Sequence, residues 1–154
     1  MGITVGAFNT NETRTVDFGA GDVRTFAASV YLTDDPSDED PREFSIASAN
    51  FRAFAGLLGL PIDDALCGEL PIADARRAIM RARATFDRRA AAFARAEEVE
   101  FGAPRTGADG TIELRPLRAW SGDLSVDRLA NYLDRFACVV EAFAARGATH
   151  VRWN

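Results

Sequence analysis

An apolar stripe with the period of a helix runs through the middle of the chain and limits what the rest can fold into. It begins at Ile72, directly after Pro71, and recurs every three or four residues up to Phe93. Because proline suits the first turn of a helix, we predict a long helix over residues 72–98. The stripe consists of Ile72, Ala75, Ile79, Ala82, Phe86, Ala90 and Phe93. A helix with one apolar face needs another layer of structure to cover that face.

Two shorter stripes predict two more helices. The first helix covers residues 50–58 and stops at Gly59, because glycine readily takes the left-handed conformation of a helix end. The second follows Ser125, a good N-cap, and stops at Gly147. The buried face of this last helix is expected to hold Leu129, Leu133, Phe136, Val140 and Phe143.

The first third of the chain has the β-branched, aromatic and alternating character of strands. We predict strands over residues 3–8, 13–18 and 23–33, with a polar turn over residues 9–12 between the first two. Further short strands are expected over residues 44–47, 67–70, 111–117 and 149–153. The expected fold class is α+β, with an antiparallel sheet of about four to six strands carrying two long helices and one short helix. A length of 154 residues suits a single domain, residues 1–154.

The charge balance limits the partners of the chain. The formal net charge is −5, and all 18 basic residues are arginine. Lysine-free, alanine-rich composition is the mark of a GC-rich genome, so arginine alone is no sign of function. An acidic chain lacks the basic footprint that nucleic-acid binding needs, which argues against a nucleic-acid partner. No apolar run approaches the roughly 18 residues of a membrane-spanning helix, and the first residues lack a signal peptide. We therefore expect a cytoplasmic protein without membrane contact.

An acidic segment over residues 34–43 interrupts the strand pattern. It holds six acids against one arginine, a charge of −5, and its two prolines and lack of large apolar residues predict an exposed loop. An EF-hand loop starting at Asp34 needs glycine where Glu39 stands and glutamate where Ser45 stands, so that motif is excluded. The remaining interpretations are a solvated loop, a weak calcium site, or a docking surface for a basic partner. The candidate binding residues are Asp35, Asp38 and Glu39.

The long predicted helix is the basic counterpart of this loop. Seven arginines against two aspartates give it a charge of +5 before a glutamate-rich end. Arg77, Arg81 and Arg88 share one side, so an anionic ligand can meet several of them at once. The interpretations left open are a solvated face, an acidic protein partner, and a phosphate or nucleic acid.

Two tryptophans are further candidates. Trp120 lies in a predicted turn and Trp153 in the terminal strand, where tryptophan serves either as an anchor for a partner or as a seal at the edge of the core.

No motif for catalysis, a cofactor or a metal is present. His150 is the only histidine, and Cys67 and Cys138 lie far apart, so no zinc set is expected and both thiols are predicted to be reduced and buried. The chain has no GxSxG motif and no phosphate-binding loop. We nominate no catalytic residue and no cofactor, although paired carboxylates leave no spacing signature.

Part of the chain resembles small proteins of GC-rich bacteria and their phages that have no assigned activity. The resemblance lies in residues 45–52 (SIASANFR), 57–60 (LLGL), 67–71 (CGELP) and 146–153 (RGATHVRW). It implies a small accessory protein and assigns no role to any residue.

Together these observations favour a non-catalytic accessory or regulatory protein that acts through a protein-binding surface. The alternative is a small enzyme or ligand-binding domain with a pocket of arginines and carboxylates. A homo-oligomer is also open: contact between the acidic loop and the basic helix weakens in salt, whereas an apolar contact at a sheet edge or at Trp153 survives it. We expect a foreign partner and at most a weak self-contact.

Overall fold

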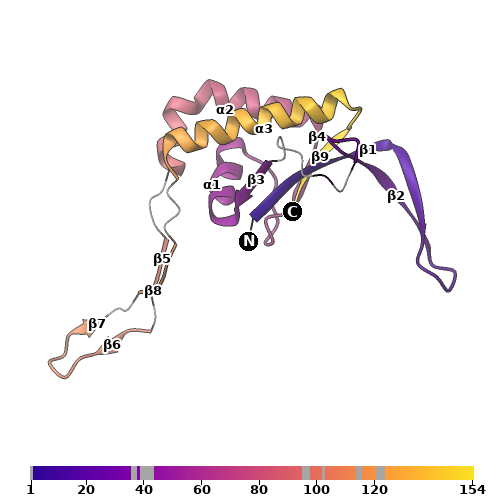
Figure 1. Cartoon of the computed structure of the whole chain (residues 1–154). Coiled ribbons are helices and arrows are strands. Elements are labelled where there is room, and N and C mark those ends of the chain that lie inside the picture. Colours follow the sequence, from indigo (N-terminus) through magenta and orange to yellow (C-terminus); the bar gives the residue numbers. More distant parts are fainter. Residues whose placement is uncertain are drawn as a thin grey trace.

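The computed structural model describes residues 2–35, 38, 44–94, 98–101, 103–113, 116–120 and 124–154. The chain is α+β, as predicted, with two long helices and one short helix (Figure 1). The helices are α1 (Ser48–Leu58), α2 (Ile72–Phe93) and α3 (Val126–Ala145). The strands are β1 (Gly2–Asp17), β2 (Val23–Val30), β3 (Phe44–Ala47), β4 (Gly68–Pro71), β5 (Glu98–Phe101), β6 (Arg105–Thr106), β7 (Ile112–Glu113), β8 (Pro116–Trp120) and β9 (His150–Trp153).

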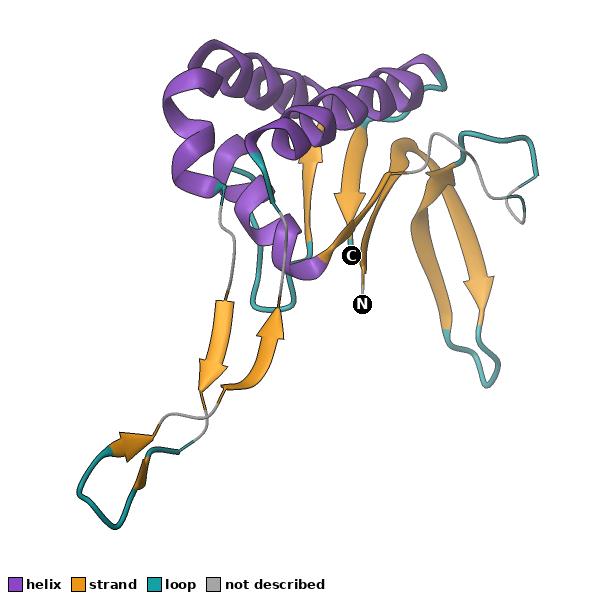
Figure 2. Ribbon diagram, turned by 60° about the vertical axis from the view of Figure 1, so that its left-hand side comes forward, coloured by secondary structure: helices purple, strands orange, loops and turns teal. Residues whose placement is uncertain are grey.

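A five-stranded antiparallel sheet forms the base of the molecule. Its order is β2-β1-β9-β4, and β3 pairs with the first residues of β1. β9 lies between β1 and β4. Trp153 of β9 is therefore flanked by Val5 of β1 on one side and by Gly68 of β4 on the other. Figure 2 shows the helices together on one face of this sheet. The N-terminal strands and the terminal strand β9 therefore share one sheet.

The core lies between the sheet and the helices. All five predicted apolar residues of α3 are buried, as are Ile72, Ala75, Ile79, Ala82 and Ala90 of α2. An aromatic cluster joins β3, α1 and α3, with the Phe44, Phe54 and Phe136 ring centroids 5.7–5.9 Å apart. Rings at these distances and tilted orientations stabilise one another beyond their burial. None of the helices in the described residues combines the length and apolar character needed to cross a membrane.

The predicted turn over residues 9–12 is a bulge within one long strand. β1 runs for 16 residues, and its register against β2 shifts between Asn9 and Thr13. The polar residues of the bulge find partners without a chain reversal: Asn11 N–H donates to Asn9 Oδ1 (2.9 Å), and Thr10 N–H donates to Thr149 Oγ1 (2.8 Å). Thr149 directly precedes β9, near the other end of the chain. The irregular register of β1 is therefore stabilised by a residue that is remote in sequence.

Several strands and helices end at residues other than those predicted. β2 stops at Val30 rather than at residue 33, and α2 stops at Phe93 rather than at residue 98, where β5 begins. The predicted strand over residues 111–117 is divided between β7 and β8. Pro71 is the last residue of β4 and precedes α2, so it lies one position earlier than a first-turn proline.

Three predicted helix-end signals, at Ser125, Gly59 and Gly147, are confirmed. Ser125 Oγ accepts a hydrogen bond from Arg128 N–H (3.1 Å) at the start of α3. Gly59 closes α1 in the left-handed region (φ 68°), and Gly147 follows α3 with φ 86°.

The predicted burial of both cysteines is wrong. Cys138 is exposed and Cys67 is half-buried, and neither forms a disulfide. The reason for Cys138 is geometric, since α3 already directs Phe136, Val139 and Val140 into the core and leaves position 138 on the solvent side.

Candidate functional site

Three arginines of α2 serve the packing of the helices. Arg76 donates two hydrogen bonds to Glu141 of α3 (2.8 and 2.6 Å). About two helical turns further along α2, Arg83 forms an ion pair with Asp134 of α3 (2.9 Å). Arg89 donates to two carbonyl oxygens at the end of α1 (both 3.3 Å) and lies 5.5 Å from the centroid of a ring on its own helix. These side chains tie α2 to α3 and α1.

The Arg76–Glu141 pair also carries an electrostatic signature. The hydrogen bonds from Arg76 hold the pKa of Glu141 below its ordinary value, and partial desolvation opposes this shift. The same hydrogen bonds, with the Coulomb attraction of the carboxylate, raise the pKa of Arg76. Both side chains are about half exposed, at 48% and 58%, so the pair is a surface clasp between helices.

The remaining arginines that the sequence analysis named lie on the exposed surface of α2. Arg77, Arg81 and Arg88 are exposed on the outer side of α2. Arg77 forms an ion pair with Asp74 one turn earlier. Within the described part of the chain, no ion pair engages Arg81 or Arg88. In the described fold, these two guanidinium groups therefore do not hold α2 to another element through an ion pair.

Two further residues complete this surface. Met80 is 62% exposed, which is unusual for a large apolar side chain on a charged helix, and Ala84 is exposed between the arginines. At 100° per residue the five positions fall within an arc of about 100° on the helix surface. We call this surface the α2 outer stripe; its members are Arg77, Met80, Arg81, Ala84 and Arg88.

Where it is described, the acidic loop contacts the end of α3. Asp34 pairs with Arg146 at the end of α3 (3.1 Å) and its side chain is fully exposed. Asp35 and Asp38 are exposed, and Asp38 N–H donates to the Asp35 carbonyl (3.1 Å). Glu39 lies outside the described residues. Among the residues that the structure describes, no group of three or more His, Cys, Asp or Glu side chains is placed to hold a metal ion.

Trp153 belongs to the core and so is corrected as a surface-binding residue. Its side chain is 0% exposed, and its ring centroid lies 6.3 Å from that of Phe51. Its buried indole N–H has no hydrogen-bond partner among the described residues. Burial removes Trp153 from contact with a partner, which leaves the core-sealing interpretation. Trp120 ends β8, and its side chain lies outside the described residues.

The sheet face opposite the helices carries a stack of side chains. The His150 and Phe8 rings are nearly parallel, with centroids 5.0 Å apart. The Arg152 guanidinium lies 4.7 Å from the Phe8 centroid and 4.0 Å from Glu69. Together these groups cover Phe8, which is only 8% exposed on a face that no helix covers. We interpret the stack as a seal over the sheet.

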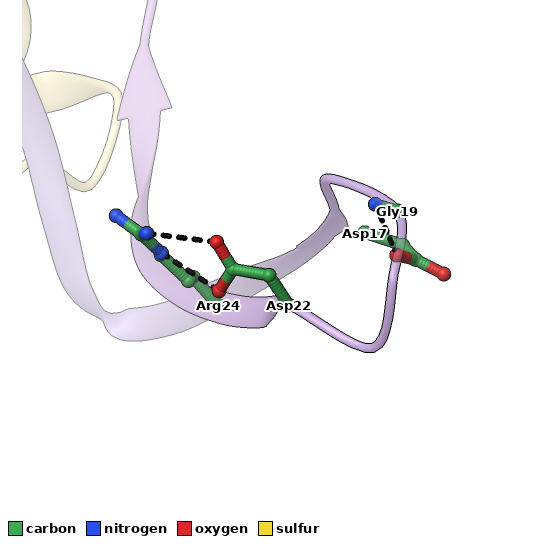
Figure 3. A network of polar contacts seen from close by, with 4 residues as sticks. All are labelled: Asp17, Gly19, Asp22 and Arg24. Carbon is green, nitrogen blue, oxygen red and sulfur yellow. Dashed lines mark hydrogen bonds and ion pairs between the residues drawn. The ribbon is translucent and has the colours of Figure 1, made fainter.

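Sequence reasoning anticipated the two strands of the β1–β2 hairpin, but not that this hairpin projects from the body of the molecule. Residues 13–27, which we call the arm, extend beyond the part of β1 that pairs with β9 and project from the body of the molecule (Figure 1). Its turn has three successive residues with positive φ, from Gly19 to Gly21. Asp17 accepts a hydrogen bond from Gly19 N–H (2.8 Å), and Arg24 forms two hydrogen bonds with Asp22 (2.9 and 2.7 Å; Figure 3).

One face of the arm exposes large apolar side chains beside Arg14 and Arg24. Val16, Phe18 and Phe26 are 42%, 59% and 47% exposed, and we call them the arm ridge. The Phe18 and Phe26 rings meet edge to face (6.3 Å), and the Arg24 guanidinium lies 5.4 Å from the Phe18 centroid. The signal for this surface is a mismatch of lengths, since β1 has 16 residues and the strand beside it, β9, has four.

Comparison of the chain with protein-family models, with curated proteins and with solved structures finds no match. The functional argument therefore rests on the geometry of this chain. The ion pairs described above leave every participating side chain more than a third exposed, and Asn50 is the only buried polar residue among the described ones. The exposed surfaces, chiefly the α2 outer stripe and the arm, are thus the features to explain.

Proposed function

We propose that this protein is a non-catalytic accessory or regulatory protein that binds an acidic protein partner through the α2 outer stripe. The division of labour among the arginines of α2 carries the proposal. Arg76, Arg83 and Arg89 hold the helices together, whereas Arg81 and Arg88 engage no ion pair in the described part of the chain. A solvated face explains exposed arginines. It does not explain an exposed methionine among them, because contact of apolar surface with water is unfavourable.

The spacing of the stripe defines the shape of the partner. Arg77 and Arg81 are separated by about 6 Å along the helix axis, and Arg81 and Arg88 by about 10 Å. A partner helix meets all three when its carboxylates recur at intervals of four and seven residues. The guanidinium fork pairs with a carboxylate through two hydrogen bonds, which favours an acidic protein segment over a diffuse anionic surface.

Charge alone is a weak basis for binding, so the apolar neighbours matter. A single exposed ion pair contributes about 0–1 kcal/mol, because side-chain entropy and salt offset the attraction. Met80 offers a flexible apolar contact for the centre of an interface, and the small Ala84 side chain lets a partner helix approach closely. The combination of an apolar centre with charged flanks is the usual anatomy of a protein interface.

The test uses fluorescein-labelled helical peptides with glutamates at intervals of four and seven residues, one for each helix direction. We expect saturable binding that weakens between 0.1 and 0.5 M NaCl, conditions chosen to shorten the screening length (about 10 Å at 0.1 M). The R81E/R88E variant should weaken binding by about a hundredfold or more, because it replaces attraction with like-charge contact.

The matched control is R52E/R105E, which makes the same charge change at two exposed arginines on α1 and β6. It should bind like the wild type. Equal loss in both double variants, or equal binding of a peptide with the same composition in scrambled order, contradicts the proposal. Nanomolar binding of single-stranded DNA in physiological salt, lost in R81E/R88E, would assign the stripe to a nucleic acid instead.

A further inference from the structure

The edges of β4, of β2 and of the arm portion of β1 differ in how they are protected against pairing. Unpaired backbone groups at a sheet edge recruit another strand unless charges, prolines, bulges or short length prevent it. The β4 edge is four residues long, carries Glu69 and ends at Pro71. The arm portion of β1 carries Arg14 and Asp17 and follows the bulge. Both of these edges are blunted.

The β2 edge lacks such protection. β2 is eight residues long, contains no proline, and has Arg24 as its only charged residue. Asp22 neutralises this charge through the two hydrogen bonds at the turn. Residues 25–30 (TFAASV) are uncharged and include the strand formers Thr25, Phe26 and Val30. An electrically neutral edge of this length is an open template for another strand.

Backbone geometry shows which groups point outward. Phe18 N–H donates to the Asp22 carbonyl (2.9 Å), so alternation along an antiparallel ladder places the outward N–H groups of β2 at Val23, Thr25 and Ala27. Thr15 and Thr25, which lie opposite each other, have hydroxyls 3.3 Å apart, as expected of a pair without backbone bonds between its members. The same alternation directs Thr15 N–H to the far edge of β1.

We infer that β2 pairs with β2 of a second copy of this chain, antiparallel and about a two-fold axis. The occupant is a copy rather than a charged foreign strand because the edge is neutral, and a two-fold contact lets one surface satisfy itself. With Phe26 opposite Phe26 of the second copy, Arg24 falls opposite Ala28, so like charges stay apart. The two Phe26 side chains then meet at the two-fold axis, with Arg24 of each copy on the same face beside them.

This inference is independent of the α2 outer stripe, and its experiment reads a different property. Sedimentation velocity of the full chain between 5 and 200 µM, in 0.15 M and 1 M NaCl, should show a concentration-dependent dimer that persists in high salt. Salt does not weaken a neutral apolar contact. It would weaken a contact between the acidic loop and α2, because that contact depends on attraction between opposite charges.

The discriminating variants are T25P and T15P. Both introduce proline in the same hairpin and both remove the Thr15–Thr25 contact, but only T25P removes an N–H from the β2 edge. The lost bond occurs twice in a two-fold pair, so T25P should raise the dimer dissociation constant by about tenfold or more. T15P should dimerise like the wild type, and circular dichroism should show both variants folded.

A second pair of variants protects the test against misfolding of the proline chains. F26E places like charges at the centre of the contact and should abolish the dimer, whereas I112E, at a 70% exposed residue of the β6–β7 hairpin, should not. A wild-type monomer at 200 µM, equal effects of T25P and T15P, or loss of the dimer in 1 M NaCl would each overturn the inference.

Discussion

Gly68 offers the sharpest test of how the sheet and its covering loop are packed. It lies in β4 opposite Trp153, and a Cβ atom built on it would lie 2.2 Å from the Pro61 carbonyl oxygen. The same atom would lie 2.8 Å from two atoms of the fully buried Trp153 indole. A backbone carbonyl and a buried ring have little room to move, so Gly68→Ala must shift the connector or the strand.

Overpacking of this kind costs about 1–3 kcal/mol, and a clash with backbone places G68A near the upper end, at about 2–3 kcal/mol. For a chain of this length each kcal/mol lowers the melting temperature by roughly 2–4 °C, so we expect a fall of roughly 4–12 °C. Gly6 of β1 is the matched control, because a Cβ atom built on it would meet no atom of the described residues within 4 Å. G6A should be neutral or stabilising by up to about 1 kcal/mol.

The assay is urea unfolding followed by circular dichroism, with thermal unfolding in parallel. Equal slopes against denaturant for both variants would show that the two substitutions change stability and not the unfolded state. A G68A chain within about 0.5 kcal/mol of the wild type would refute the close approach of β4, the connector and Trp153. Equal destabilisation by G6A would show that the effect is one of strand glycine in general.

Three further outcomes follow from the described contacts. Trp153→Ala should cost about 3–5 kcal/mol, whereas Trp153→Phe should cost much less, because phenylalanine refills most of the site and removes the unpaired buried indole N–H; equal losses in urea unfolding would contradict this. Glu141→Gln should lower stability at pH 7, and the difference should vanish as pH falls through the carboxylate pKa, since a pKa held low in the folded state stabilises only the ionised form; a difference that grows in acid would reverse the sign. Ser125→Ala should cost about 1 kcal/mol by removing the cap on α3, whereas Ser125→Asp should retain the stability of the wild type in thermal unfolding.

The helices could be predicted because their information is local. The stripe of α3 repeats over five buried residues, and Ser125 and Gly59 are signals whose chemistry acts within one turn. The alternation of the buried Val151 and Trp153 with the half-buried His150 and the exposed Arg152 likewise follows from strand geometry alone. These features need no knowledge of what lies across the fold.

The misplaced features depend on distant partners. The bulge at Asn9 continues as one strand because Thr149 supplies its hydrogen bonds from the far end of the chain. Cys138 is exposed because other α3 residues already fill the space beneath that helix. Neither outcome is written in the local pattern.

The candidate site shows the same division. The outward grouping of Arg77, Arg81 and Arg88 follows from helical spacing, so it was predictable. The sequence could not show which arginines of α2 bind neighbouring helices. That depends on Glu141 and Asp134 of α3, which lie more than 50 residues away in the chain. The projection of the arm was missed because the arm's alternating pattern is typical of a half-buried strand, and its exposure depends on the short length of β9.

The central claim is that the α2 outer stripe is the surface that meets an acidic partner, and amide shift mapping by NMR tests it most directly. The unlabelled peptide with glutamates at intervals of four and seven residues is titrated into ¹⁵N-labelled protein. The account predicts saturable shifts concentrated at Met80, Arg81, Ala84 and Arg88, with the arm at Phe18 unchanged. Shifts centred on the arm, or spread evenly over all exposed arginines, would contradict it.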